Sequence, residues 1–239
     1  MEWCIIGQIE FNNLKSYDNF NLIIKTVEVS YPTPKIIKNS VPFQNWEYDF
    51  TELYGDTPYS NRAVKVEFEY EGYKVATRTK LYSFYTEIIN WLYGAMESKL
   101  IIDYEVGYFK GRVVNISPVE VLNGTGKITV EFDCYPFRIY EQPEGNDIWD
   151  IFNFDLDYSQ DTVYEIDGEL NIDLFNSSII SKIPEVTCSA AMEVTKNGIT
   201  YKFKPGTSKD WRFILNKGSN KLLIKGTGNI KFKFIKEVL

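Results

Sequence analysis

The chain has 239 residues, of which 44% are apolar and 16% aromatic, and it carries a formal net charge of −7. The apolar content is sufficient for a folded core, and its 17 Tyr and 16 Phe favour pleated sheet over helix. Because there is no histidine, the usual Ser/His/Asp and Cys/His nucleophile arrangements and most catalytic zinc sites are excluded. The negative charge also disfavours a protein that grips phosphate backbones.

The three cysteines predict neither a disulfide framework nor a zinc cluster. Cys4, Cys134 and Cys188 are odd in number and form no CxxC pair, so we interpret them as buried free thiols. We expect no cofactor and no metal. No stretch approaches the roughly 20 apolar residues that cross a bilayer, and the segment after Met1 lacks the basic start of a signal peptide. These observations predict a soluble protein that is synthesised in a cytoplasm.

The first distinctive segment is rich in proline and aromatic residues. Its prolines interrupt any central strand and are Pro32, Pro34, Pro42 and Pro58. Its aromatic side chains, the last three of which share one side of an extended chain, are Phe43, Trp46, Tyr48 and Phe50. Two interpretations remain open. The segment is either a hairpin folded back on its own domain or an arm that lays these aromatics on another subunit.

Alternating patterns predict a sheet in the first half of the chain. Val64–Tyr70 and Lys127–Cys134 alternate with a strict period of two, so one face of each is buried. Leu100–Tyr104 and Gly111–Ile116 indicate two further strands. We therefore predict a β-sandwich domain.

One helix is expected between these strands. From Phe84 to Ser98 the apolar residues follow one helical face and are Tyr85, Ile88, Ile89, Leu92, Tyr93 and Met96. Ser83 is the predicted N-cap. Gly94 would lie inside this helix and weaken it.

A domain boundary is predicted at residues 145 and 146. Pro143 and Gly145 interrupt regular structure there, and the charge balance changes. Residues 147–173 contain nine acids and no Lys or Arg, whereas 194–239 contain eleven Lys or Arg and two acids. The sequence therefore predicts one domain over 1–145 and a second domain over 146–239.

The second domain is expected to be a small antiparallel sandwich. Four alternating segments are separated by glycines: Ile199–Phe203, Trp211–Leu215, Leu222–Ile224 and Ile230–Phe234. Gly226-Thr227-Gly228 is interpreted as a hairpin turn. The lysines expected on outward faces, where they would discourage unwanted sheet pairing, are Lys202, Lys204, Lys231 and Lys233.

The second half contains two candidate ligand sites, one for calcium and one for carbohydrate. The acidic stretch fails the calcium-loop template, since Gln160 stands where Gly is needed and Ile166 where Glu is needed. A looser calcium site from Asp155, Asp157 and Asp161 is the less favoured alternative to a solvated segment. Trp149 is a weak carbohydrate-contact candidate. Trp211 is expected in the core, because it lies on the inward face of the alternating segment Trp211–Leu215.

Several fragments resemble the distal tail (Dit) family of phages with long tails. Ile9-Glu10-Phe11-Asn12-Asn13 and Asn19-Phe20-Asn21-Leu22 are similar to its opening strands, with Asn13 and Asn21 where glycine is usual. Val41-Pro42-Phe43-Gln44-Asn45-Trp46 is similar to the segment "I-P-G-R-D-G", without its glycines. The most specific match is Phe132-Asp133-Cys134-Tyr135-Pro136-Phe137-Arg138, which resembles the "F-x-C-x-P-F" that closes the first domain. The resemblance covers 1–140 well and the rest more loosely.

The resemblance implies a mainly β protein. Residues 1–145 would be a ring-forming β-sandwich with one helix and the aromatic arm, and residues 146–239 a galectin-like or carbohydrate-module-like β-sandwich. The resemblance also implies a structural role, without catalytic residues, as a hexameric ring at the distal end of the virion tail. Such a ring would join the tail tube protein to the tail-tip hub protein and leave a channel through which DNA passes unbound. Phe43, Trp46, Tyr48 and Phe50 are our candidates for the ring interface.

Two alternative functions remain. The first is a baseplate-associated carbohydrate-binding module that recognises host saccharide through the second domain; a receptor-binding protein is a further candidate partner of the chain. The second is a glycosidase, since the 33 acids would supply a carboxylate pair in any case.

Overall fold

The computed structural model describes residues 7–70, 78–118, 120–122, 125–146, 153 and 157–239. The chain forms two compact units. The first comprises residues 1–35 and 58–139 with Leu239, and the second comprises 36–57 and 140–238. The second unit thus resumes at residue 140, slightly before the boundary expected at 145. Residues 36–57, the part of the proline-rich segment that contains its aromatic side chains, also group with the second unit.

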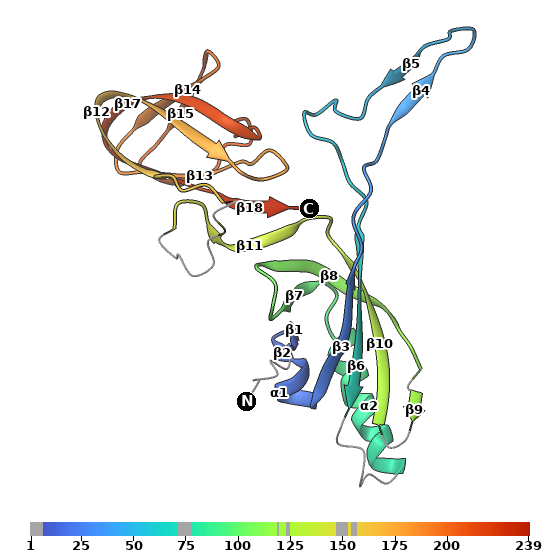
Figure 1. The fold of residues 1–239 in the computed structure, drawn as a ribbon. Coiled ribbons are helices and arrows are strands. Elements are labelled where there is room, and N and C mark those ends of the chain that lie inside the picture. The colour runs from blue at the N-terminus through green and yellow to red at the C-terminus, as the bar shows by residue number, and fades with distance from the viewer. Residues whose placement is uncertain (1–6, 71–77, 119, 123–124, 147–152, 154–156) are drawn as a thin grey trace. The chain divides into compact units, whose positions relative to one another are not determined.

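One antiparallel sheet dominates the first unit (Figure 1), in the order β2-β1-β7-β8-β10-β6-β3. Its strands are β1 (Ile9–Phe11), β2 (Leu14–Lys15), β3 (Leu22–Val29), β6 (Arg62–Tyr70), β7 (Ser98–Ile102), β8 (Tyr108–Ile116) and β10 (Thr125–Cys134). The short β9 (Glu120–Leu122) pairs with β10, and β11 (Arg138–Pro143) begins by pairing Ile139 with Tyr108 of β8. All four strands predicted in this half are present.

The core of the first unit forms because the sheet curls onto itself. The rings of Phe11 in β1 and Phe132 in β10 meet edge to face at 5.2 Å, although β7 and β8 separate their strands in the sheet. The alternation in β6 buries Val64, Val66 and Phe68 completely. Each fully buried side chain of this size stabilises the fold by about 1.5–3 kcal/mol.

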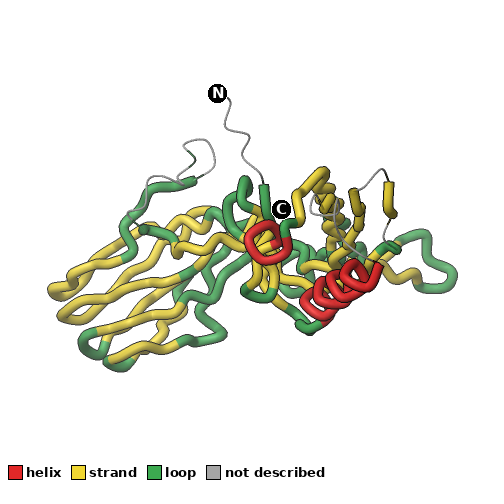
Figure 2. Tube along the Cα trace, turned by 90° about the horizontal axis from the view of Figure 1, so that it is seen from below, coloured by secondary structure: helices red, strands yellow, loops and turns green. Residues whose placement is uncertain are grey.

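Both described helices belong to this unit, and Figure 2 shows them as the red coils. Helix α1 (Ser16–Phe20) was not predicted. Helix α2 (Arg78–Tyr93) begins and ends earlier than the predicted Phe84–Ser98. Ser83 is therefore inside the helix. Gly94 follows its last residue. A Cβ at this position would lie 2.6 Å from the carbonyl oxygen of Asn90, so glycine is required where the helix ends.

The buried face of α2 is also narrower than predicted. Ile88 and Leu92 are buried, but Met96 lies beyond the helix and is exposed. Trp91, absent from the predicted stripe, donates its indole N–H to the carbonyl oxygen of Phe11 at 2.7 Å and stacks on Phe20 at 4.6 Å. The helix is thus fixed to β1 by an aromatic side chain that also needed a hydrogen-bond acceptor.

The second unit is a sandwich made by two long strands that bend. β12 (Val163–Asn176) pairs with β17 (Gly218–Lys233) along its whole length. On its other side β17 pairs first with β14 (Met192–Lys196) and then with β13 (Glu185–Cys188). β15 (Ile199–Phe203) extends the first half-sheet, β16 (Gly206–Ser208) the second, and β18 (Ile235–Val238) follows β17. Both halves contribute to one core.

The bend corrects the prediction of a turn at Gly226-Thr227-Gly228, because these residues lie inside β17. Gly226 pairs with Gly168 of β12, and the φ angles of Gly168, Gly226 and Gly228 are +88°, +146° and +124°. A Cβ on Gly228 would lie 2.3 Å from Ser189 Oγ. Glycine is therefore required where the strand changes direction and a neighbouring loop approaches closely.

One further prediction for this half is wrong, and it concerns Trp211 rather than the acidic stretch. The later part of that stretch forms β12, and the acids Glu165, Asp167, Glu169 and Asp173 are exposed there, as expected for a solvated segment. Trp211 is not in the core: 75% of its surface is exposed. Asp210 accepts a hydrogen bond from the backbone N–H of Arg212 at 3.0 Å and ion-pairs with its side chain. The chain therefore turns at Trp211 and forms no strand, although Phe213 and Leu215 are buried as expected.

The mainly β fold class is confirmed, as are the exposed positions of the predicted outward lysines. Three residues that stand where the resemblance expects glycine have positive φ angles. They are Asn13, Asn21 and Phe43, with φ of +60°, +50° and +68°. The backbone is left-handed at these three positions, although this conformation costs more for a residue with a side chain than for glycine.

Candidate assembly surface

Residues 36–57 form a hairpin, which we call the arm. Its strands are β4 (Lys38–Ser40) and β5 (Glu47–Asp49), which pair antiparallel and form a two-stranded sheet of their own (Figure 1). Beyond them the Phe50 N–H donates to the carbonyl oxygen of Ile37 at 2.8 Å, and the Ile37 N–H donates to Thr51 Oγ1 at 3.0 Å. The arm is thus an ordered element, held by its own hydrogen bonds.

The tip of the arm contains a strained turn. The Gln44 N–H donates to the carbonyl oxygen of Val41 at 3.2 Å, so Val41-Pro42-Phe43-Gln44 is a four-residue turn with proline at its second position. Proline favours this position, and the third position takes a positive φ that is usually given to glycine. Phe43 takes it at +68°, at a cost of about 1–2 kcal/mol.

The aromatic side chains of the arm are uncovered. Phe43 is fully exposed and Trp46 is 72% exposed, while Tyr48 and Phe50 stack on each other at 6.4 Å and are about two-fifths exposed. Other exposed apolar residues of the arm are Ile36, Ile37, Val41, Leu53 and Tyr54. Exposed apolar surface on this scale marks interaction sites in soluble proteins. All four predicted interface residues are therefore brought together on one element.

The arm is attached to its unit by a charged side chain. The Asp56 carboxylate accepts two hydrogen bonds from Ser181, one from the backbone N–H at 3.0 Å and one from the hydroxyl at 3.2 Å. Charge-assisted bonds of this kind are stronger than neutral ones. The arm is therefore anchored at its C-terminal end.

The other acids of the arm differ in their partners. The Thr51 N–H donates to Asp49 Oδ1 at 2.9 Å, and hydrogen bonds from Thr51 hold the pKa of Asp49 below its ordinary value. Glu52 accepts a hydrogen bond from the Thr57 hydroxyl at 2.9 Å. Glu47 is exposed between Trp46 and Tyr48, and its carboxylate has no partner among the described residues.

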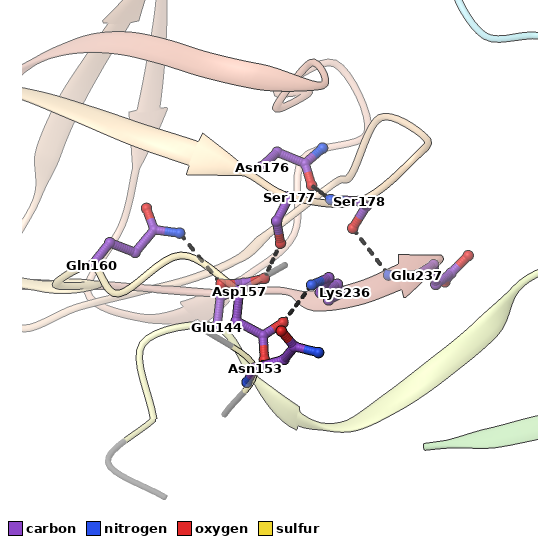
Figure 3. A network of polar contacts seen from close by, with 9 residues as sticks. All are labelled: Glu144, Asn153, Asp157, Gln160, Asn176, Ser177, Ser178, Lys236 and Glu237. Carbon is purple, nitrogen blue, oxygen red and sulfur yellow. Dashed lines mark hydrogen bonds and ion pairs between the residues drawn. The ribbon is translucent and has the colours of Figure 1, made fainter. Parts of the chain in front are cut away.

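A second notable group is a network of polar side chains in the second unit, which we call the polar seam (Figure 3). Glu144 accepts hydrogen bonds from the Ser177 hydroxyl and from the Gln160 amide. Gln160 also bonds both backbone groups of Phe175, at 2.7 and 2.9 Å. Burial raises the pKa of Glu144, although both hydrogen bonds oppose the shift.

The rest of the seam involves β18. Lys236 forms an ion pair with Asp157, and Lys182 forms another with Glu237; all four side chains are largely buried. Asp157 also accepts a hydrogen bond from the Asn153 N–H at 2.8 Å. The Asp157 carboxylate is thus already neutralised by an amine. This ion pair disfavours the alternative calcium site, of which Asp155 lies outside the described residues. Within the described ranges, no group of three acids or cysteines could hold a metal.

The sequence singled out five further residues, which are Trp149, Asp155 and the three cysteines. Trp149, Asp155 and Cys4 lie outside the described residues. Cys134 and Cys188 are buried free thiols, and burial raises the pKa of Cys134 to about 12. None of the described helices is both long enough and apolar enough to cross a bilayer. Sequence patterns missed the polar seam because its members are single polar residues far apart along the chain.

Comparisons with known proteins identify the fold. No family model and no curated protein matches the chain. The structure is similar to the crystal structure of the Dit protein of phage SPP1, with a TM-score of 0.63 and 14% sequence identity, over 98% of this chain and 100% of that chain. That protein is described as a paradigm of the hub adsorption apparatus in phages that infect Gram-positive bacteria.

Two chains of the phage p2 baseplate in its activated conformation also match. One comes from the structure with strontium and one from the structure with calcium, with TM-scores of 0.40 and 0.41, both at 11% identity. They cover 97% and 96% of this chain, and 98% of each p2 chain. The SPP1 match alone confirms the resemblance at the level of the fold, over nearly the whole chain.

Proposed function

We propose that this chain is a structural component of a phage tail tip, where copies of it form a ring, six in number by analogy with the resemblance. The ring would join the tail tube protein to the tail-tip hub protein. The observation that carries the proposal is the shared fold with SPP1 Dit over nearly the full length of both chains. No catalytic step is assigned to any residue.

The arm supports this proposal. A closed ring needs a head-to-tail interface between two different patches of each subunit. Interface centres are enriched in aromatic side chains, and the arm presents Phe43, Trp46, Tyr48 and Phe50 without covering them. We assign the arm as one of the two patches.

The net charge of −7 supports a conduit that does not retain DNA. A basic wall would bind the phosphates of passing DNA. We therefore propose an acidic or neutral channel wall. A strongly basic lumen in a structure of the ring would contradict this part of the proposal.

The arm assignment is tested by the double variant Trp46→Ala/Tyr48→Ala. Ring mass by native mass spectrometry should fall to that of smaller species, while the unfolding transition of the monomer stays unchanged. The matched control is Trp211→Ala/Ile199→Ala, which removes two exposed apolar side chains elsewhere and should leave the ring intact. Rings of unchanged mass in the arm variant would reject the assignment.

Trp211 favours a second candidate function, recognition of host saccharide. Its exposed indole could form a stacking platform for a sugar ring. A glycan array probed with the full chain distinguishes the two functions, because specific binding lost in Trp211→Ala would support saccharide recognition. Silence of the wild-type chain on the array would leave the structural role as the sole proposal.

A further inference from the structure

Two arginines in the first unit form a cluster that the proposed role has not used. Arg62 begins β6 and pairs with Cys134 of β10, and Arg138 begins β11. The Arg62 guanidinium lies 5.2 Å from the centroid of the Phe109 ring. The Cys134 thiol is neutral at physiological pH, since its pKa is raised to about 12. The thiol therefore supplies no negative charge.

The cluster contains buried guanidinium groups without hydrogen-bond acceptors. Arg62 is only 4% exposed, and its Nε and Nη2 atoms are buried with no partner in the part of the chain that the structure describes. The same is true of Arg138 Nε. Buried polar atoms are nearly always paired in native proteins, so these atoms point to a missing acceptor.

The charges of the cluster also indicate a missing acceptor. Arg138 Nη1 donates to Glu105 Oε2 at 2.9 Å, which leaves two guanidinium charges facing one carboxylate. Burial and the proximity of Arg138 lower the pKa of Arg62. One further carboxylate would neutralise the cluster. Arginine forms its strongest contacts with such planar anions.

The surroundings indicate what kind of chain carries this carboxylate. Arg138 keeps 27% of its side chain exposed and provides the entry to the cluster. Nearby, Phe137 contacts the rings of Tyr59 and Tyr135 at 5.4 and 5.5 Å, and Tyr31 is 86% exposed. The site therefore suits an acidic side chain that lies between aromatic residues.

The arm has one acid that fits this description. Its other three acids are already bonded, Asp49 to Thr51, Glu52 to Thr57 and Asp56 to Ser181. Glu47 remains free between Trp46 and Tyr48. An extended hairpin with about ten residues in each side reaches roughly 30 Å, about the diameter of a small domain. The arm is thus long enough to reach an adjacent subunit.

We propose that Glu47 on the arm of one copy binds the guanidinium groups of Arg138 and Arg62 on the next copy. This inference rests on the proposed ring and supplies its second patch. The carboxylate enters at Arg138 and completes the hydrogen bonding of Arg62, while Trp46 and Tyr48 pack against the exposed rings around the cluster. The pairing is head-to-tail, as a closed ring requires.

Charge reversal tests this pairing in the full chain. Arg138→Glu and Glu47→Arg should each weaken ring assembly at least about tenfold, as loss of a buried interfacial charge pair does, and the double variant should restore it. Arg112→Glu and Glu165→Arg are the matched controls, since both residues are exposed on other strands and neither change should affect assembly. Ring mass is measured by native mass spectrometry, and the unfolding of each monomer verifies its fold.

Added malonate serves as a small dicarboxylate probe of the same site. It should stabilise wild-type monomer, have no such effect on Arg138→Gln, and dissociate wild-type rings. If malonate binds but Glu47→Arg still assembles, the natural carboxylate comes from elsewhere and the inference is wrong. It is equally wrong if folded Arg138→Glu forms normal rings, or if the double variant fails to recover them. A wild-type chain that never forms rings would instead reject the proposed function itself.

Discussion

The arm and the polar seam belong to the same unit but treat their side chains in opposite ways. In the seam, the side chains of Glu144, Asp157 and Lys236 are largely shielded from water. Each contacts a group of opposite charge or forms a hydrogen bond. In the arm, Phe43 and Trp46 remain in water, and Glu47 has no partner within the described ranges. The seam is complete within one copy of the chain, whereas we propose that the arm becomes complete on contact with another copy.

This difference separates folding from assembly. Changes in the seam and in the core beneath it should alter the free energy of unfolding, because those contacts exist in the monomer. Changes in the arm should alter association instead. The following expectations test this separation, beginning with the largest effect.

The largest effect is expected for Phe232→Ala. Phe232 is fully buried in the second core, where it contacts the rings of Tyr164 and Phe213. Its removal leaves a cavity and should lower the free energy of unfolding by about 3–5 kcal/mol. Urea denaturation measures this loss. Phe43→Ala, an exposed phenylalanine of the arm, is the matched control and should change the monomer by less than about 1 kcal/mol.

A somewhat smaller effect is expected in the seam for Asp157→Asn. This change leaves the Lys236 amine buried without its counter-charge and should cost about 3 kcal/mol. The combined variant Asp157→Leu/Lys236→Met removes both charges and should recover much of that stability. A double variant that is less stable than the single one would show that the ion pair is not the reason for the loss.

The pH dependence of Glu144 should give a smaller effect. Because its pKa is raised in the folded chain, the folded state binds the proton more tightly than the unfolded state. Its contribution to stability should therefore increase as the pH falls from neutrality toward the ordinary glutamate value of 4.5. Comparing the unfolding of wild type and Glu144→Gln across this range isolates the effect, since the other acids are shared. A difference that is independent of pH would contradict it.

The smallest change is expected for Phe43→Gly, and it should have the opposite sign. Glycine adopts the positive φ of residue 43 without steric cost, so the monomer should gain up to about 1 kcal/mol. Ring assembly should weaken at the same time, because an aromatic contact is lost. Thermal unfolding and ring mass together measure both consequences. Loss of monomer stability would mean that Phe43 packs within its own chain.

Local sequence patterns predicted the strands that have one buried face and one exposed face. β6 was recognisable because Val64, Val66 and Phe68 alternate with charged residues, and its buried face follows that alternation. β12 was not recognisable. It lies at the sheet edge with a pair on one side only, so just a few of its residues, such as Ile166 and Leu174, are buried. The positive φ of Gly168 further interrupts its periodicity.

Features that depend on tertiary contacts could not be predicted from the sequence. The glycines of β17 resemble a turn locally, and only the paired Gly168 shows that they form a bend. The alternating pattern predicts an inward position for Trp211, but the turn stabilised by Asp210 directs its side chain outward. The arm aromatics were identified because their spacing is local. Arg62 and Arg138, by contrast, are brought together by the fold of the sheet from distant positions.

The measurement that tests the central claim most directly is the native mass of the purified chain, alone and mixed with the tail tube protein that we propose as its partner. Our account predicts a closed assembly of identical copies in one or both samples, reduced to smaller species by Trp46→Ala/Tyr48→Ala. A chain that stays monomeric at high concentration in both samples would contradict the account.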